Sequence, residues 1–225
     1  AAILERSIRY TLKHKKDELD LRAISAQLAD QIGRLGYRYE LERTIAALSA
    51  NFINLPAGGI DAGITISLST VGQLIRAGVG YVYLFDETSG ELALSHHWCE
   101  DRNASGLLDR LDARETGALT AVLDECGHIL TGPFGQRMLA EIPAAFWNGR
   151  TPHAVILAQM LIGGGMLGLI GFEAMADDLQ EDSATPVRFT TEVITNALER
   201  KRMEDALRES EERYALAVRG ASDGV

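Results

Sequence analysis

Three residues close together in the chain, His96, His97 and Cys99, are of types that bind metals. Imidazole and thiolate groups ligate zinc and other transition metals, and a stable site needs three or four of them converging on one ion. Side chains alternate between the two faces of a strand, so His96 and Trp98 are expected on one face, with His97 and Cys99 on the other. This spacing matches no metal-binding pattern. We therefore interpret these residues as partly buried, hydrogen-bonded strand residues and predict no metal site.

Aromatic residues provide a better candidate for a binding site. Three of them lie in an irregular segment rich in Gly and Pro that is expected to cover a sheet, and two lie in predicted strands. Aromatic side chains with a few polar groups suit a small planar ligand. Close packing of the same side chains in a core is the alternative interpretation. The candidate pocket residues are His96, Trp98, Phe134, Phe146, Trp147, Phe172 and Glu173. No catalytic motif is recognised, and the cofactor, if there is one, stays unknown.

Composition limits the possible partners. The 225 residues carry 22 basic and 32 acidic side chains, a net charge of −10. Nucleic acids and anionic membrane surfaces need a basic face on their partner, so neither is expected. The longest apolar run, residues 154–171, is interrupted by Gln159 and several glycines and is not expected to span a membrane. Two cysteines are too few for a disulfide framework, which favours a reducing cytoplasm.

The pattern of apolar residues predicts a mixed fold. Spacings of three and four residues predict helices, whereas alternation and short apolar runs predict strands. The expected helices are 2–55, 60–77, 115–125 and a long final helix that begins near residue 187. The expected strands are 80–86, 91–98, 128–130, 152–160 and 167–173, the last two joined by a glycine-rich hairpin. This order is typical of the α+β class: an antiparallel sheet flanked by helices, with residues 131–150 crossing the other face and roofing a cavity.

The final helix is densely charged, so we expect it to protrude from the domain and to pair with another helix. Two sets of its residues recur every seven positions: Val193, Arg200, Leu207 and Tyr214, and Asn196, Met203, Ser210 and Ala217. This imperfect heptad pattern is typical of a weak, dimeric coiled coil. We therefore expect a parallel homodimer formed by the first and last helices. The candidate dimer residues are Leu28, Leu35, Val193, Asn196, Arg200, Met203 and Leu207.

Three motifs, in the appropriate order, resemble a GAF domain of bacterial signalling proteins. Residues Asn51–Pro56, followed by Ile60 and Asp61, are similar to the opening of one GAF subset. Residues His96–Cys99 resemble its second strand, and Leu167–Glu173 resemble its final hairpin. Two features depart from that subset: the segment after the second strand is short, and an aromatic residue that commonly follows the hairpin is missing. The ligand specificity of the subset is therefore not transferable to this chain.

The flanking segments resemble other signalling domains. Residues 1–20 resemble the end of a receiver domain, and 214–225 resemble the start of a PAS domain. Between them, the resemblance implies a signalling helix over 21–55, a GAF domain over 56–186 and a coiled-coil connector over 187–213. We therefore expect a piece of a longer cytoplasmic protein with covalently linked receiver and PAS or output domains. Histidine kinases of two-component systems and enzymes of cyclic-di-GMP metabolism commonly have this arrangement.

The resemblance implies a sensory or relay module without catalytic residues of its own. It would pass the state of a small-molecule ligand, or of the receiver, to an output domain through dimeric helices. A ligand-free dimerisation module is the alternative. Some GAF domains attach a bilin through a Cys beside a His, but here Cys126 and His128 lack the other tetrapyrrole-binding motifs. Free methionine sulfoxide reductases with this fold need several cysteines near the pocket, whereas Cys99 and Cys126 lie on separate elements.

Overall fold

The computed structural model describes residues 2–101, 106–127, 129–133, 140–174 and 183–222. The chain divides into two compact units, residues 1–43 and 44–225. In the first unit the described residues all belong to one long helix, α1 (Ala2–Asn54), which is continuous through Gly33 and Gly36. The last turns of α1 belong to the second unit.

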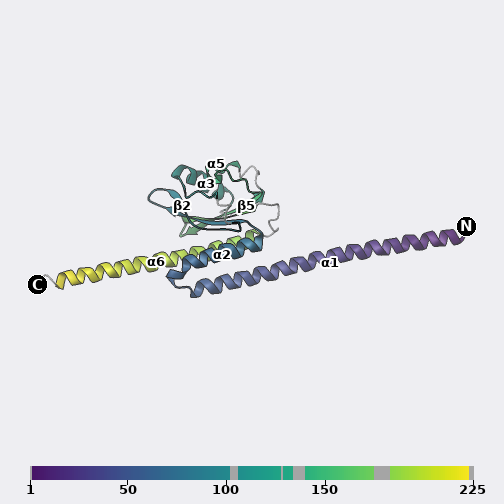
Figure 1. Cartoon of the computed structure of the whole chain (residues 1–225), viewed down its shortest axis with the longest axis horizontal. Helices are drawn as coiled ribbons and strands as arrows, with labels where there is room; N and C mark the ends of the chain where they lie inside the picture. Colours follow the sequence, from purple (N-terminus) through teal and green to yellow (C-terminus); the bar gives the residue numbers. More distant parts are fainter. Residues whose placement is uncertain (1, 102–105, 128, 134–139, 175–182, 223–225) are drawn as a thin grey trace. The chain divides into compact units, whose positions relative to one another are not determined.

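The second unit contains the sheet and the other helices, coloured by sequence in Figure 1. After α1 the chain forms η1 (Ala57–Gly59), α2 (Ile60–Ile75), β1 (Val79–Asp86), β2 (Glu91–Cys99), β3 (Arg110–Leu111), α3 (Ala113–Glu125), β4 (Ile129–Pro133), α5 (Ala144–Trp147), β5 (Ala154–Ile162), β6 (Gly165–Ala174) and α6 (Ala184–Ser222). Helices α2 and α6 lie along one face of the sheet, and α3 and α5 lie along the other (Figure 1).

The described strands form one antiparallel sheet of six, in the order β3-β2-β1-β6-β5-β4. Strand β1 lies inside the sheet, where Val79 pairs with Cys99 of β2 on one side and with Glu173 of β6 on the other. The β5–β6 hairpin turns at Gly163 and Gly164, whose φ angles of 58° and 85° lie in the left-handed region that favours glycine. The predicted glycine-rich hairpin is thus present.

The sheet separates two apolar cores. One face of α2 closes the first core with five fully buried side chains at helical spacing: Ile60, Ile64, Leu68, Val71 and Ile75. The first half of α6 packs into the same core, for example through Val187 and Ile194. The second core, on the opposite face, includes Leu119 of α3 and Phe146 of α5. Each candidate site residue on the sheet therefore faces either the first core or the second core.

The predicted α+β class, the antiparallel sheet with flanking helices and the long terminal helices are confirmed. Three short elements, η1, β3 and α5, have no counterpart in the prediction. Strand β3 is a two-residue segment paired with Leu92 and Ala93, and α5 is a single turn after Pro143, so neither is long enough to create a periodicity. The expectation that the whole final helix protrudes is wrong, because residues 187–198 supply buried side chains to the first core.

Candidate functional site

Three of the candidate pocket residues lie on the α2 and α6 side of the sheet. Trp98 and Phe172 pack against the first core, and Nε2 of His96 lies 3.4 Å from Oδ1 of Asp61 in α2. Helix α2 approaches Trp98 so closely that a Cβ atom added to Gly72 would lie 2.3 Å from the indole ring. These side chains therefore fill the contact between helix and sheet, and leave no room there for a ligand.

Three other candidates, Phe146, Trp147 and Glu173, lie on the opposite face. Phe134 lies outside the described residues. The structure therefore does not bring the six described candidates into one pocket, which corrects the expectation of a single cavity. The physical reason is the alternation of side chains along a strand, which sends the adjacent Phe172 and Glu173 to opposite faces.

Four aromatic rings, here called the aromatic cluster, pack between the sheet and α5: Tyr81, Tyr83, Phe146 and Trp147. The ring centroids are 5.6 Å apart for Tyr81 and Tyr83, 6.1 Å for each tyrosine with Phe146, and 5.0 Å for Phe146 with Trp147. These distances and the inclined ring planes are those that aromatic pairs prefer. All four side chains are buried. The described part of this face is therefore packed with the protein's own side chains.

A buried ion pair lies beside the aromatic cluster. Arg150 donates from Nε and from Nη2 to the two carboxylate oxygens of Glu173, each at 3.1 Å. Its Nη2 also donates to the carbonyl of Phe146 at 3.0 Å, and its Nη1 donates to the carbonyl of Gly106. The Glu173 side chain is fully buried and that of Arg150 is 6% exposed. These hydrogen bonds connect α5 and the segment at Gly106 to β6, and they compensate both buried charges.

Sequence reasoning missed the two tyrosines and Arg150. Tyr81 and Tyr83 are ordinary strand residues in the sequence, although their separation by two positions is the signal that puts both on one face. Burial, and then the Glu173 carboxylate, raise the pKa of Tyr81 well above its usual value. Burial raises the pKa of Tyr83 to about 12, and its hydroxyl donates to the carbonyl of Leu108 at 2.8 Å. Both phenols are therefore neutral at physiological pH and are not nucleophiles.

A second polar cluster lies where α6 leaves the domain, and we call Asp61, His96 and Lys201 the α6 junction. Nζ of Lys201 donates to both carboxylate oxygens of Asp61 at 2.6 and 2.7 Å, and this hydrogen bonding lowers the pKa of Asp61. The His96 ring contacts the same carboxylate through Nε2, while its Nδ1 lies 2.9 Å from the hydroxyl of Ser95. One carboxylate on α2 therefore receives contacts from both β2 and α6.

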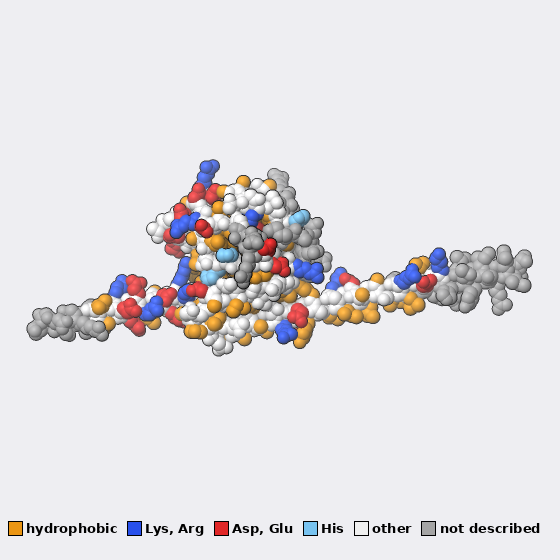
Figure 2. Space-filling model, viewed as in Figure 1, with side chains coloured by type: hydrophobic (Ala, Val, Ile, Leu, Met, Phe, Trp, Pro, Cys, Tyr) orange, Lys and Arg blue, Asp and Glu red, His pale blue; other side chains and the backbone are white. Residues whose placement is uncertain are grey.

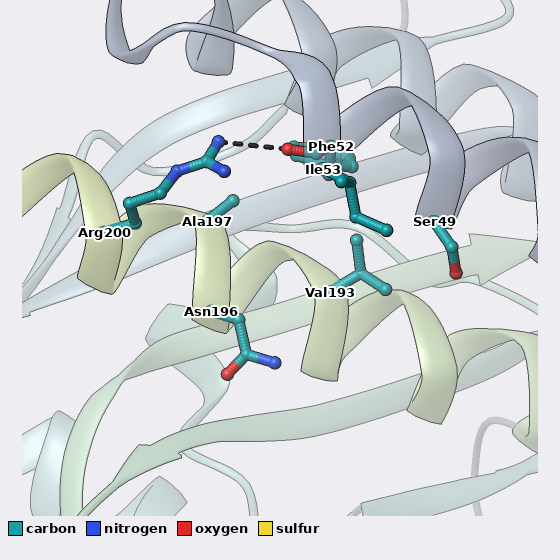
Figure 3. A pocket seen from close by; sticks show the side chains of 7 residues that line it. All are labelled: Ser49, Phe52, Ile53, Val193, Asn196, Ala197 and Arg200. Carbon is teal, nitrogen blue, oxygen red and sulfur yellow. Dashed lines mark hydrogen bonds between the residues drawn. The ribbon is translucent and has the colours of Figure 1, made fainter.

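A groove between the end of α1 and α6 lies next to this junction (Figure 3). Its volume is about 340 Å³, and its lining residues are Ser49, Phe52, Ile53, Val193, Asn196, Ala197 and Arg200. Arg200 donates from Nη2 to the carbonyls of Phe52 and Leu55, at 3.0 and 2.8 Å, so it satisfies carbonyls at the end of α1 that have no partner within the helix. The apolar side chains of Ile53 and Val193 point toward each other across the groove (Figure 3).

The candidate dimer residues fall into two groups. Four are apolar side chains that are 56–66% exposed in the single chain: Leu28, Leu35, Met203 and Leu207. The other three line the groove: Val193, Asn196 and Arg200. In the single chain, the four exposed apolar side chains therefore contribute to neither core.

The remaining chemistry candidates do not converge on a site. Within the described residues, no group of three or more His, Cys, Asp or Glu side chains is arranged to hold a metal ion. Cys99 ends β2 and Cys126 caps α3, and burial raises the pKa of each thiol, so both are weak nucleophiles at neutral pH. His128 lies outside the described residues. Among the helices that the structure describes, none is long and apolar enough to cross a membrane.

Acidification is expected to weaken the fold through His96. Burial lowers the pKa of His96 below its usual value of 6.5, with a smaller contribution from Lys201 on α6, and Asp61 on α2 opposes this effect. The unfolded chain therefore takes up the proton first, and the free energy of unfolding falls as the pH drops below 6.5. Thermal unfolding followed between about pH 7 and about pH 5.5 measures this slope.

The substitution His96→Gln should remove part of that slope, whereas His97→Gln, at an exposed position next to it, should retain it. Asp61 acts in a separate range, because its lowered pKa means that its contribution is lost only as the pH falls below 3.8. An equal slope in the wild type and in His96→Gln would contradict the assignment to His96.

Comparison with known proteins identifies the architecture. No protein-family model matches the chain, and no curated protein matches its sequence. Among solved structures, the GAF domain of a phosphoenolpyruvate-protein phosphotransferase from Coxiella burnetii has a TM-score of 0.60 at 12% identity, covering 75% of this chain and 98% of that domain. A phycocyanobilin-bound GAF domain from a cyanobacterial phytochrome has a TM-score of 0.56 at 12% identity, covering 73% of this chain and 96% of that domain.

A bacteriophytochrome from the photosynthetic bacterium R. palustris is also similar, with a TM-score of 0.64 at 13% identity. That match covers 80% of this chain but 41% of the bacteriophytochrome, so this chain corresponds to less than half of that protein. At these identities the similarity establishes a fold and leaves ligand and activity open. Together with the antiparallel sheet and its flanking helices, the comparisons show that residues of the second unit form a GAF-like α+β fold.

Proposed function

We propose that this chain is a sensory or relay GAF module that passes a signal along its terminal helices in a homodimer. The observation that carries the proposal is the position of one strip on α6. This strip, the α6 seam, is Val193, Asn196, Arg200, Met203, Leu207, Ser210 and Tyr214, which follow one another at alternating spacings of three and four residues. Its first three residues line the groove, and Met203, Leu207 and Tyr214 are 61–74% exposed.

The other side of α6 already has a partner, because Val187 and Ile194 pack into the first core. The seam is therefore a side of this helix on which Met203, Leu207 and Tyr214 still face water. Complete burial of a Leu or Met side chain contributes about 1.5–3 kcal/mol, so covering the seam is favourable. A second copy of the chain offers the same strip, and parallel pairing about a twofold axis sets each position opposite itself. Asn196 would then meet Asn196 of the second copy, a polar pair of the kind that fixes register.

Helix α1 carries a matching strip. In the first unit, Leu28, Ile32, Leu35 and Tyr39 are 56–66% exposed, and Figure 2 displays apolar side chains along this part of the helix. In the second unit, Ser49 and Ile53 line the groove. In the sequence, these six residues belong to one series with alternating spacings of four and three residues, which runs from Leu28 to Ile53 through positions 42 and 46. This continuity supports a second copy of the chain, rather than an unrelated protein, as the partner of both helices.

The double substitution Met203→Glu/Leu207→Glu tests the dimer. We expect sedimentation equilibrium to detect a wild-type dimer at micromolar concentration and an association at least about 100-fold weaker in the variant, because each substitution affects both copies. The thermal midpoint of the isolated domain should change little, since both side chains are exposed in the single chain.

Arg202→Glu is the matched control, because it makes the same total change in charge at an exposed position outside the seam. It should leave the association nearly unchanged. A wild-type chain that remains monomeric at high micromolar concentration would contradict the proposed relay, because the helices would then have no partner through which to act.

A ligand-free dimerisation module is the second candidate, and the aromatic cluster favours it. Four buried rings occupy the face of the sheet on which a small planar ligand was expected. Native mass spectrometry of the protein purified from its own host distinguishes the two candidates. A stoichiometric small molecule that survives purification would support the sensor, and a dimer without added mass would support the ligand-free module.

The flanking resemblances support a wider context. We propose that residues 1–20 and 214–225 connect this module to receiver-like and PAS-like domains in a longer cytoplasmic protein. In that setting, phosphorylation of the receiver would alter the packing of the paired helices, and an output domain such as a histidine kinase or a cyclic-di-GMP enzyme would respond. A relay of this kind needs two packings that differ by only a few kcal/mol, and polar seam residues such as Asn196 and Ser210 reduce the difference.

A further inference from the structure

Two successive cations hold α6 at the point where it leaves the domain. Arg200 and Lys201 are partly buried, whereas every residue from Arg202 to Leu216 is exposed. Arg200 binds carbonyls at the end of α1, and Lys201 binds Asp61 in the first turn of α2. These two side chains therefore tie α6 to the end of α1 and to α2 at its last partly buried turn.

The two anchors differ in what they bind. Arg200 binds main-chain carbonyls, whose positions are fixed by the backbone at the end of α1. Lys201 binds a side chain that has a second contact, because Nε2 of His96 also lies 3.4 Å from the Asp61 carboxylate. When the Ser95 hydroxyl donates to Nδ1 of His96, the ring carries its proton on Nε2, the nitrogen that faces the Asp61 carboxylate. The Asp61 carboxylate is 54% exposed, so it needs such partners to stay in one position.

The backbone that holds His96 is also the backbone beneath the aromatic cluster. His96 pairs with Val82 of β1, and the β1–β2 register shifts between Val82 and Tyr83. Tyr81 and Tyr83 flank Val82 and point to the opposite face, into the aromatic cluster. A displacement of these tyrosines would therefore move the irregular strand pair to which His96 belongs. This gives a continuous series of contacts from the α5 side of the sheet to α6.

We propose that Asp61 is a switchable latch for α6. With His96 in contact, the carboxylate is held where Lys201 reaches it, and a shift of β2 that withdraws His96 loosens α6 at its exit from the domain. The latch rests on the proposed relay function, because only a relay gives the loosening a consequence. Through His96, Asp61 and Lys201, a change on the α5 side of the sheet would reach the α6 seam.

Hydrogen exchange of the full-length chain, read by mass spectrometry on a peptide covering residues 198–206, tests the latch. Lys201→Met and Asp61→Asn should each accelerate exchange in this peptide about fivefold, the factor expected for loss of a partly exposed ion pair. His96→Gln should accelerate it about threefold, although the contact of His96 is with α2 rather than α6. A β5 peptide should exchange at the wild-type rate in every variant.

The double variant His96→Gln/Lys201→Met separates a latch from two independent contacts. Because both residues act through one carboxylate, the double variant should exchange no faster than Lys201→Met alone. His97→Gln and Arg202→Met, at exposed neighbouring positions, are the matched controls and should leave the exchange rate unchanged. The latch would be overturned if the two substitutions multiplied each other's effect on the exchange rate in the double variant. It would also be overturned if His96→Gln exchanged at the wild-type rate.

The same experiment in the Met203→Glu/Leu207→Glu background distinguishes failure of the latch from failure of the relay. All three junction residues lie in one chain, so the latch should persist when the dimer is dissociated. A monomeric wild type would refute the relay while leaving the non-additive exchange effects intact. If the wild type is a stable dimer but the two substitutions have multiplicative effects on the exchange rate, the latch is refuted and the relay is not.

Discussion

Replacement of Arg150 with methionine is expected to lower the free energy of unfolding by about 3–5 kcal/mol, the usual effect of removing one partner of a buried ion pair. The Glu173 side chain is fully buried, so its carboxylate would keep the cost of burial and lose both hydrogen bonds from the guanidinium. The carbonyls of Phe146 and Gly106 would lose a donor as well. Urea unfolding at neutral pH measures the change.

Two further variants make this prediction specific. Arg110→Met removes the corresponding partner of the exposed Arg110–Glu91 pair, whose side chains are 68% and 32% exposed, and should cost at most about 1 kcal/mol. Arg150→Met/Glu173→Leu replaces both charges with apolar groups and should recover much of the lost stability. Equal, small losses in Arg150→Met and Arg110→Met would mean that the Glu173 carboxylate is not buried as described.

Truncation of Phe146 to alanine is expected to cost about 3–5 kcal/mol. The ring is fully buried and contacts Tyr81, Tyr83 and Trp147 at centroid distances of 6.1, 6.1 and 5.0 Å. Its removal leaves a cavity, because the two tyrosines are held by the central strand β1 and cannot move into the space. Phe146→Leu keeps most of the volume and should cost less than about 1.5 kcal/mol.

Benzene provides the control for this prediction. An apolar cavity of ring size binds small aromatic molecules, so benzene should raise the thermal midpoint of Phe146→Ala. It should leave the wild type unchanged, because the Phe146 ring already occupies the space. Stabilisation of the wild type by benzene would show that the face under α5 is open, and would favour a ligand-binding module over a ligand-free one.

Elements with a long regular pattern could be predicted from the sequence. Helix α2 was predictable because Ile60, Ile64 and Leu68 recur at helical spacing, and all are buried. Strands β1, β2, β5 and β6 were predictable because each is eight to ten residues long with an apolar or alternating pattern. The two-residue strand β3 and the four-residue helix α5 carry no period, so sequence reasoning had no signal for them.

The expectation that the whole final helix protrudes was wrong because it was based on the average charge density over the full length of the helix. Residues Val187, Ile194 and Leu198 form an apolar side in its first half, and the charged residues that dominate the composition come mostly after Arg200. The first half of this helix thus completes a core, whereas its second half, from Arg202 to Leu216, is exposed on all sides. Over a window of about 12 residues, the apolar pattern of the first half is distinct from the charged pattern of the second.

The candidate site was only partly predictable, because its contacts join residues far apart in the chain. Glu173 was among the candidate pocket residues, but its partner Arg150 lies 23 positions away in an irregular segment. Lys201 and Asp61 are 140 positions apart, and no local pattern connects them. In contrast, the placement of His96 and Trp98 on one face follows from strand alternation alone, and the structure agrees.

The last turns of α1 and the first half of α6 run in the same direction along the groove, from Ser49 to Ile53 on one side and from Val193 to Arg200 on the other (Figure 3). In the proposed homodimer, paired helices that enter through the end of α1 would therefore keep their polarity when they continue through α6. Insertion or tandem duplication of such a module during evolution needs no reversal of chain direction. It would have to preserve only the phase of the seven-residue repeat on either side of the folded domain.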